Sequence, residues 1–462
     1  MLLAVFNQEF DLIYSREAEF ESSLKIASNS EGEVTASFES VFNSELAYLR
    51  SEATPDNQLV LFISADSRRT GGLIKDIAFS YDSDVVSVNI TSFDPLGSVL
   101  SSVVTSYDPT RSRENAVRVN DLQMDAANGT IGYFGACLTQ SYVGPASVGN
   151  SWHTSWTQSR ADILFGTPVY MDIPEFSPGY IPREIMVPRV TSKLSEAMGN
   201  LFAQVPELSM YAEIVIPDDN HEKLPSGGFY IKPIVSASTG QPVMPDYDSD
   251  KKADFTDKLK TLLTNLENEN SPIEFADIPT NSIVYNHDNT YTVEEVITPR
   301  VAGRIVFGGS SYTVGEGSDE YTEEYTNVWG SLDLDKGYVT RPEYLHKSGD
   351  ARWNARNKGG LFKSIPEIAG KREIVVDVKD SSPWKPLIDF HPGEMIFLEV
   401  PMRKGLYYPM KLSGIEASFG TTSASTFKLT CEKSPYQNVA NMILESINNR
   451  EARIEELAKG NK

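Results

Sequence analysis

Five aspartates in the segment DYDSDKKADFTD have the spacing of oxygen ligands in a calcium-binding loop. They occupy the first, third, fifth, ninth and twelfth positions, at Asp246, Asp248, Asp250, Asp254 and Asp257. Carboxylates at these positions can surround a hard cation. However, the sixth position is Lys251 rather than the glycine that the loop needs for its turn. The last ligand is also an aspartate rather than the longer, bidentate glutamate.

The same segment has the features of a helix N-terminus. Carboxylates are stabilised there by the helix dipole, and Asp248 or Asp250 would serve as the N-cap. We favour this interpretation, and we keep Asp246, Asp248, Asp250 and Asp257 as a calcium-site candidate. No cofactor site is predicted anywhere in the chain.

The histidines and cysteines form no recognisable site. No two histidines have the helical spacing of metal ligands; they are His153, His221, His287, His346 and His391. A lone histidine in a Ser- or Pro-rich loop is normally a surface residue. Cys137 and Cys431 are far apart and belong to no CxxC motif, so we predict two buried thiols rather than a disulfide or a zinc site.

Motifs of the common catalytic classes do not occur in the sequence. It contains no GxSxG, P-loop or HExxH motif, and no GxGxxG that opens a helix. The acidic segment GEGSDEYTEEY, at 315–325, is typical of a solvated loop, although glycosidases also need carboxylate pairs. Trp152 and Trp156 suit sugar stacking and an interface anchor equally. We therefore assign no catalytic residue and predict that the chain is not an enzyme.

Composition and charge narrow the class of protein. A chain of 462 residues is long enough for two to four domains, and its Tyr, Phe, Val and Thr content favours strands. The net charge of −23 disfavours binding to phosphate backbones and anionic lipid, and it also favours solubility. The sequence contains no apolar run of about eighteen residues and no basic, apolar N-terminal signal. We therefore predict no membrane span and folding in a cytoplasm.

Residues 1–108 are predicted to form a first β-barrel-like domain. Alternating apolar residues predict strands at 33–42, 58–65, 72–81 and 84–93, separated by turn-forming clusters such as TPDN and SRRTGG. The segment DPLGSVLSSVV then predicts a short helix with Asp94 as its cap and Pro95 in its first position.

The middle of the chain is predicted to be inserted between two β regions. Residues 109–240 are rich in Pro and aromatic residues, with one amphipathic helix at 190–205 and strands at 210–217 and 229–236. Residues 241–340 are predicted to combine a helix at 251–267 with strands in 283–339. Residues 341–370 are polar and locally basic, as expected of a linker.

A second β-barrel-like domain is predicted at 371–436. Its strands are REIVVDVKD, MIFLEVP, YYPMKLSGIEASFG and STFKLTCEK, and a C-terminal helix follows in 437–462. That helix has heptad-like apolar spacing, so it would pack on its own domain or associate with another copy; we favour the first. The predicted fold class is mainly β with some α, with helical and irregular middle domains between the two β domains.

Two segments resemble a known family. In 58–104, the series QLVLFISADSRRTGGLIKDIAFSY…DVVSVNITSFDPLG contains a strand, a turn, a Gly-x-Ile-x-x-Ile strand and a strand that leads into Asp-Pro-Leu. In 390–432, FHPGEMIFLEVP…KLSGIEASFG…TFKLTCE contains a Pro-Gly-acid turn, a middle strand with Gly-Ile and a final Thr/Leu strand. These segments resemble the tail-hub, or baseplate hub, proteins of tailed phages and related contractile machines.

The resemblance implies a structural virion protein. Such hubs are homotrimeric rings with two similar barrels per subunit, which match the hexameric tail tube on one side and the tail spike or tip on the other. The implied partners are therefore the tail tube, distal tail proteins and a spike or tip protein. DNA would pass through the lumen without sequence-specific binding, and the acidic charge suits such a wall.

Two other classes fit the β-rich profile. A receptor-binding or adhesin tail protein would favour tandem repeats or a long fibrous stretch. A polysaccharide-degrading tail enzyme would favour short-period β-helix repeats. Neither pattern occurs in the sequence.

Overall fold

A computed structural model describes most of the two ends of the chain and parts of its middle. The described residues are 1–102 (except 18 and 83), 130, 131, 134, 160–164, 167–171, 193–204, 208–235, 272–278, 282–298, 304–308, 310–314, 321–325, 330–333, 343–347, 371–379, 381–420 and 425–432. The predicted helices at 251–267 and 437–462 lie outside them.

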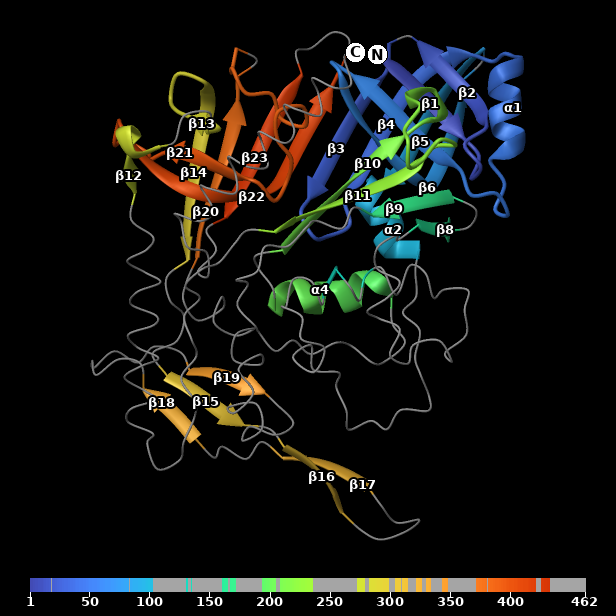
Figure 1. Cartoon of the computed structure of the whole chain (residues 1–462). Helices are drawn as coiled ribbons and strands as arrows, with labels where there is room; N and C mark the ends of the chain where they lie inside the picture. Colours follow the sequence, from blue (N-terminus) through green and yellow to red (C-terminus); the bar gives the residue numbers. More distant parts are fainter. Residues whose placement is uncertain are drawn as a thin grey trace.

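The fold is mainly β, as predicted, and its largest sheet has 14 strands (Figure 1). The first part of the chain contributes β1 (Leu2–Phe6), β2 (Leu12–Glu17), β3 (Glu21–Ala27), β4 (Glu33–Val41), β5 (Val60–Ala65), β6 (Arg68–Asp82) and β7 (Val85–Phe93). The last part contributes β12 (Ile273–Glu274), β13 (Val284–Tyr285), β14 (Thr290–Thr298), β20 (Lys371–Val378), β21 (Met395–Glu399), β22 (Leu406–Phe419) and β23 (Thr426–Glu432).

The two β regions share this sheet instead of standing apart. Strand β22 pairs antiparallel with β3, with Gly414 opposite Ala27 and Phe419 opposite Ser22. In Figure 1 the blue and red halves of the chain meet at these strands. One hydrophobic core runs beneath both halves, from Val34 and Ile90 to Ile415 and Leu429. The ends of the chain therefore form one structural body.

The same strand order occurs twice in the sheet. The first region has the order β3-β4-β7-β6-β5-β1, and the second has the order β14-β20-β23-β22, with β21 on β22 and β13 on β21. We call these the N-terminal unit and the C-terminal unit. The long strands β6 and β22 each pair first with a short strand and then with the strand that follows them. Both also bulge between these two halves, at Ile74/Asp76 and at Leu412/Gly414.

Alternation along the strands explains why these segments form a sheet with one buried face. Val34, Ala36 and Phe38 of β4 are buried, and so are Ile374 and Val376 of β20, while the residues between them are at least partly exposed. A period of two puts such residues on one face of a strand. Helix α2 (Pro95–Ser102) follows β7, and the Asp94 carboxylate accepts the backbone N–H of Gly97, so the predicted cap is confirmed.

An inserted layer covers the other face of the N-terminal unit. It contains β8 (Arg160–Leu164), β9 (Thr167–Met171), α4 (Leu194–Gln204), β10 (Leu208–Val215), the 3-10 turn η4 (Pro217–Asp219) and β11 (Gly228–Val235). The sheet order is β10-β11-β9-β8. Its core joins Phe6 and Phe62 of the N-terminal unit to Met198, Leu201 and Phe229. The helix predicted at 190–205 is confirmed over Leu194–Gln204.

Several shorter elements complete the described chain. Helix α1 (Ser44–Glu52), which the sequence analysis missed, is capped by Asn43, whose side chain accepts the Leu46 N–H. The other elements are η6 (Phe275–Asp277), β15 (Arg304–Gly308), β16 (Ser310–Val314), β17 (Tyr321–Tyr325), β18 (Gly330–Asp333) and β19 (Glu343–Lys347). Strand β19 lies within the predicted 341–370 linker. No helix in the described part of the chain is long and apolar enough to span a membrane.

Candidate assembly edges

The second half of β6 has an uncovered edge. Its counterpart in β22 has β23 on one side and β3 on the other, whereas residues 76–82 of β6 have β7 and, among the described residues, no second strand. The side chains reflect this difference. Ile415, Ala417 and Phe419 of β22 are at most 4% exposed, whereas Tyr81 of β6 is 53% exposed.

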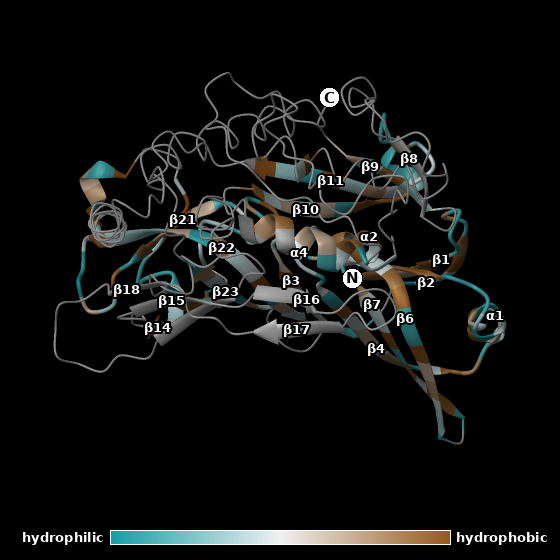
Figure 2. Cartoon of the chain, turned by 90° about the horizontal axis from the view of Figure 1, so that it is seen from below, coloured by the Kyte–Doolittle hydropathy of each residue, from teal (hydrophilic) through white to brown (hydrophobic). Residues whose placement is uncertain are grey.

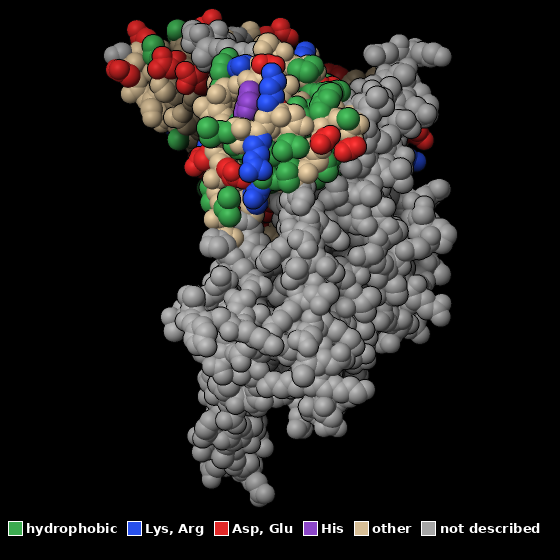
Figure 3. Space-filling view, turned by 90° about the vertical axis from the view of Figure 1, so that its left-hand side faces the viewer, with side chains coloured by type: hydrophobic (Ala, Val, Ile, Leu, Met, Phe, Trp, Pro, Cys, Tyr) green, Lys and Arg blue, Asp and Glu red, His purple; other side chains and the backbone are tan. Residues whose placement is uncertain are grey.

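Strand β14 is the second uncovered edge. It stands at the end of the sheet and pairs only with β20 in the described structure, whereas its counterpart β3 lies between β4 and β22. Its exposed side chains include Tyr291 (68%), Val296 (44%) and Ile297 (58%). Figure 3 shows the side of the molecule that carries β12 to β14, where hydrophobic side chains lie among basic and acidic ones. An open, partly apolar strand edge readily pairs with another strand.

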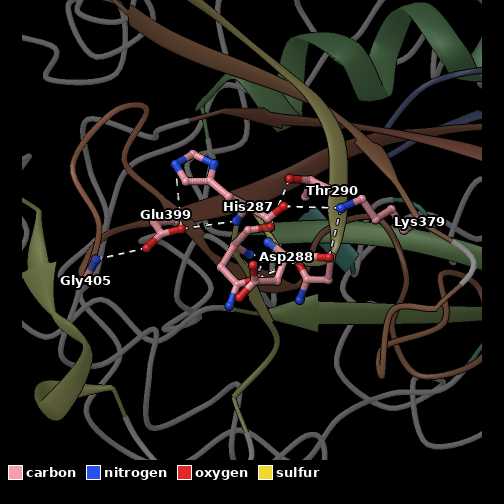
Figure 4. Close-up of polar contacts among 8 residues, drawn as sticks. His287, Asp288, Thr290, Lys379, Glu399 and Gly405 are labelled. Carbon is pink, nitrogen blue, oxygen red and sulfur yellow. Dashed lines mark hydrogen bonds and ion pairs between the residues drawn. The ribbon is translucent and has the colours of Figure 1, made fainter.

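A polar cluster at the start of β14 fixes this edge to the C-terminal unit (Figure 4). The buried Glu399 carboxylate accepts the backbone N–H of His287 at 3.1 Å and that of Gly405 at 2.9 Å. The Lys379 ammonium donates to the carbonyls of His287 and Asp288, at 3.4 and 3.0 Å. These charged groups bind backbone atoms of the β13–β14 and β21–β22 turns, so their role is to position the strands.

The tip of the β6–β7 hairpin carries an apolar surface. The hairpin extends beyond the rest of the ribbon (Figure 2). Five exposed residues lie at this end of the sheet and on the adjoining helix α1: Val41, Phe42, Tyr48, Tyr81 and Val85. Val41 pairs with Val85 across β4 and β7, and the Arg50 guanidinium lies 5.4 Å from the centre of the Tyr81 ring.

The solvent face of the shared sheet is polar and rich in carboxylates. Strand pairing places Asp377, Lys428, Glu416, Lys25 and Glu33 in one row that crosses both units. Lys25 and Glu416 form an ion pair of 2.9 Å at the junction of the units. The other acidic side chains on this face are Glu21, Glu39, Asp76, Asp82, Glu294, Glu373 and Glu432. The sheet therefore presents a predominantly acidic surface to solvent.

Buried contacts hold the two units together. The Arg68 Nε donates to the Pro386 carbonyl at 2.8 Å, and its guanidinium lies 4.2 Å from the centre of the Phe427 ring. Arg68 belongs to β6, whereas Pro386 and Phe427 belong to the C-terminal unit. Arg68 and Arg69 are adjacent in the SRRTGG segment, and Arg69 is exposed at the surface. The sequence therefore does not show that Arg68 is the buried one of the two.

The inserted layer also contacts both units. Asn29, in the β3–β4 turn, donates to the Leu208 carbonyl and accepts the Met210 N–H, at 2.8 and 2.7 Å. The His391 ring stacks on Tyr211 with 4.3 Å between ring centres. At Gly393, a Cβ atom would come within 2.5 Å of the Ser209 Cβ, so this turn requires glycine. Strand β10 is thereby fixed against the predicted Pro-Gly-acid turn.

The structure does not bring the predicted chemical residues together. The calcium candidates Asp246, Asp248, Asp250 and Asp257 lie outside the described residues, as do Asp254, His153, Trp152, Trp156 and Cys137. His221, His287 and His391 lie in separate turns, and no metal-binding group of three or more side chains occurs among the described residues. Cys431 is buried, and desolvation raises the pKa of its thiol well above the ordinary value.

Comparisons with known proteins find similar folds. No family model and no curated protein matches the chain. A tail protein from Neisseria meningitidis is 10% identical, with a TM-score of 0.45, and the match covers 95% of this chain and 98% of that one. The 43 kDa tail protein of prophage MuSo2 from Shewanella oneidensis is 10% identical, with a TM-score of 0.44 and coverage of 94% and 99%.

A secretion-system protein also matches. An Escherichia coli component of the type VI secretion system is 7% identical, with a TM-score of 0.37 and coverage of 91% of this chain and 75% of that one. Because the TM-scores lie below 0.5, these matches assign no function to this chain.

Proposed function

We propose that this chain is a structural tail or baseplate subunit whose copies join side by side into a ring. The observation that carries the proposal is the repeated sheet unit. Within one chain, the C-terminal unit covers the β3 edge of the N-terminal unit, while no described strand covers the corresponding edges on β6 and β14. A chain built in this way has complementary surfaces at its two ends, and such head-to-tail surfaces produce closed rings when the rotation closes.

The proposed ring is a homotrimeric tail hub. Three chains would present six similar units, which suits a hexameric tail tube on one side, while the inserted layers would follow threefold symmetry towards a spike or tip. The number three rests on the tail-hub resemblance. The partners on this proposal are the tube, distal tail proteins and the spike or tip, and the chain resides in the virion tail after assembly in a host cytoplasm.

The acidic face of the sheet supports a passage for DNA. Carboxylates outnumber lysines on this face, and the few lysines pair with carboxylates across strands, as Lys25 does with Glu416 and Lys75 does with Glu33. Repulsion between such a wall and phosphates acts over about 8–10 Å at physiological salt. The wall would therefore let DNA slide through without sequence-specific binding. No residue on this proposal is catalytic.

Negative-stain electron microscopy of the purified chain tests this function. The proposal predicts ring-shaped particles with a central opening and threefold class averages. Compact single chains at high protein concentration would contradict it, and they would favour the receptor-binding alternative, in which a monomer carries its contacts at the apolar hairpin tip. Glycan-array binding would then be the next measurement.

A further inference from the structure

The pairing of β22 with β3 supplies a template for a second contact. Six residue pairs define it, from Gly414 opposite Ala27 to Phe419 opposite Ser22. Within it, Ile415 faces Ile26 and Glu416 faces Lys25. This is the only unit-to-unit strand pairing in the described part of the chain.

The equivalent of β22 in the N-terminal unit is β6, and the bulges set the register between the two strands. The bulge follows Leu412 in β22 and Ile74 in β6. After it, Ile415 faces Leu429 of β23, and Ile77 faces Ile90 of β7. Ile77 therefore corresponds to Ile415.

The equivalent of β3 in the C-terminal unit is β14, and the neighbouring strands set this register. Glu33 faces Lys25 across β4 and β3, and Glu373 faces Val296 across β20 and β14. Glu33 faces Phe93 of β7, and Glu373 faces Glu432 of β23. Phe93 and Glu432 each lie three residues after the matching residues Ile90 and Leu429, so Glu33 corresponds to Glu373. Val296 therefore corresponds to Lys25, and Ile297 corresponds to Ile26.

We propose that β6 of one copy pairs antiparallel with β14 of a second copy, in the register that β22 and β3 use within the chain. Ile77 then faces Ile297, Ala78 faces Val296 and Tyr81 faces Val293 of the second copy. This contact rests on the proposed function, because it names the strands through which the ring closes.

The side chains along the two edges are compatible with this register. The contact buries Tyr81, Val296 and Ile297, which are 53%, 44% and 58% exposed in the single chain. No like charges face each other: Asp76 lies opposite Thr298, and Ser80 lies opposite Glu294. Like charges directly opposite would weaken the pairing.

These edges lack two of the features that commonly protect an edge strand, although they carry acidic side chains and β-bulges. Neither β14 nor residues 76–82 of β6 contains proline or lysine, which proteins commonly place on edges to prevent pairing. Glu295, which would face Phe79, already pairs with Arg372 at 3.3 Å in its own chain. Its charge is therefore compensated before the second copy arrives. An edge of this length without proline or lysine, and with its inward carboxylate already paired, suits a partner strand.

Cysteine cross-linking tests the register. The double variants Ala78→Cys/Val296→Cys and Ile77→Cys/Ile297→Cys place two cysteines opposite each other between copies. Adjacent antiparallel pairs alternate between Cα separations of about 4.5 and 5.5 Å, so one of the two suits a disulfide. The matched control, Ala78→Cys/Glu294→Cys, shifts one cysteine by two residues on the same face. The parent chain with Cys137 and Cys431 supplies the background.

After mild oxidation, at least one in-register variant should form covalent multimers several-fold more than the shifted control on a non-reducing gel. Equal or absent cross-linking would overturn the inference. Light scattering of the same samples separates the two failures. An oligomer without in-register cross-links would refute the β6–β14 contact but not the ring. Monomers at high concentration would refute both.

Discussion

The N-terminal and C-terminal units follow one strand order, yet corresponding strands differ in exposure. Ile26 of β3 is partly buried beside β22, whereas its counterpart Ile297 of β14 is 58% exposed. Likewise, Phe419 is 3% exposed and its counterpart Tyr81 is 53% exposed. The strands themselves are similar, and what differs is whether a neighbouring unit covers them.

This difference shows what an isolated chain reveals about its assembly. The open edge of β6 has Ile77, Phe79 and Tyr81 at the positions of the covered residues Ile415, Ala417 and Phe419 in β22, so these apolar residues are the ones that a partner would cover. Natural edge strands without such a partner are normally blunted by charge or proline. The exposed apolar residues therefore identify a specific contact surface. Substitutions at matching covered and open positions test this inference.

The largest effect is expected at the covered strand. Ile415→Ala should reduce the free energy of unfolding by about 2–5 kcal/mol, because it leaves a cavity in a fully buried position. The matched variant Ile77→Ala, on the open strand, should cost about 1 kcal/mol or less, because less apolar area is lost from the half-buried site. Urea unfolding of dilute, monomeric protein gives both values, and equal losses would refute the distinction between the edges.

The buried arginine between the units gives the next effect. Arg68→Met removes a charged hydrogen bond to the Pro386 carbonyl and should cost about 1.5–3 kcal/mol. Arg69→Met, on the adjacent residue, removes a partly exposed ion pair with Asp219 and should cost less than about 1 kcal/mol. Thermal unfolding of both variants measures the two losses of stability. A larger loss for Arg69→Met would show that Arg68 is not a main contact between the units.

A pH effect is expected in the N-terminal unit. Burial raises the pKa of Asp94 from 3.8 to about 7, against the opposing effect of its hydrogen bonds to the Gly32 and Gly97 N–H groups. The folded state therefore holds a proton that the unfolded state releases, so stability from this group is complete below about pH 4 and is lost as the pH rises to about 7.

Asp94→Asn should remove this pH dependence while keeping a side chain that can cap α2. The measurement is the difference in unfolding free energy between wild type and variant from pH 4 to pH 8. The wild type should lose stability relative to the variant across this window. A difference that stays constant with pH would show that Asp94 does not titrate there.

The smallest effect is expected on the solvent face of the junction. The side chains of Lys25 and Glu416 are 72% and 46% exposed, so solvent and salt screen their ion pair. A double-mutant cycle with Lys25→Met and Glu416→Gln should give a coupling of about 0.2–1 kcal/mol that shrinks with added salt. A coupling above about 2 kcal/mol would mean that the row of charges is a main support of the junction.

Much of the local structure could be predicted from the sequence. Alternation and turn residues located β4, β5, β6, β7 and the strands of 371–436, and the Asp-Pro start located α2. Helix α1 was missed because only Leu46 and Leu49 are buried, too few to give a clear helical period. These strands and helices depend on residues that are close in the sequence. A clear local pattern is therefore sufficient to predict them.

The joining of the units could not be predicted in this way. The β22–β3 pairing links residues almost a whole chain apart, and an alternating strand does not reveal which strand lies beside it. For the same reason β14 was assigned to a middle domain, although it pairs with β20. The burial of Arg68 also depends on Pro386 and Phe427, which only the tertiary structure brings to it.

The mass of the chain in solution tests the central claim most directly. Light scattering over a range of protein concentrations should give three chain masses for the wild type. It should give a lower mass for a variant with a charged residue on each open edge, such as Tyr81→Asp/Ile297→Asp. A wild type that stays at one chain mass at the highest concentration would contradict assembly through these edges, and so would a trimer that the double variant leaves intact.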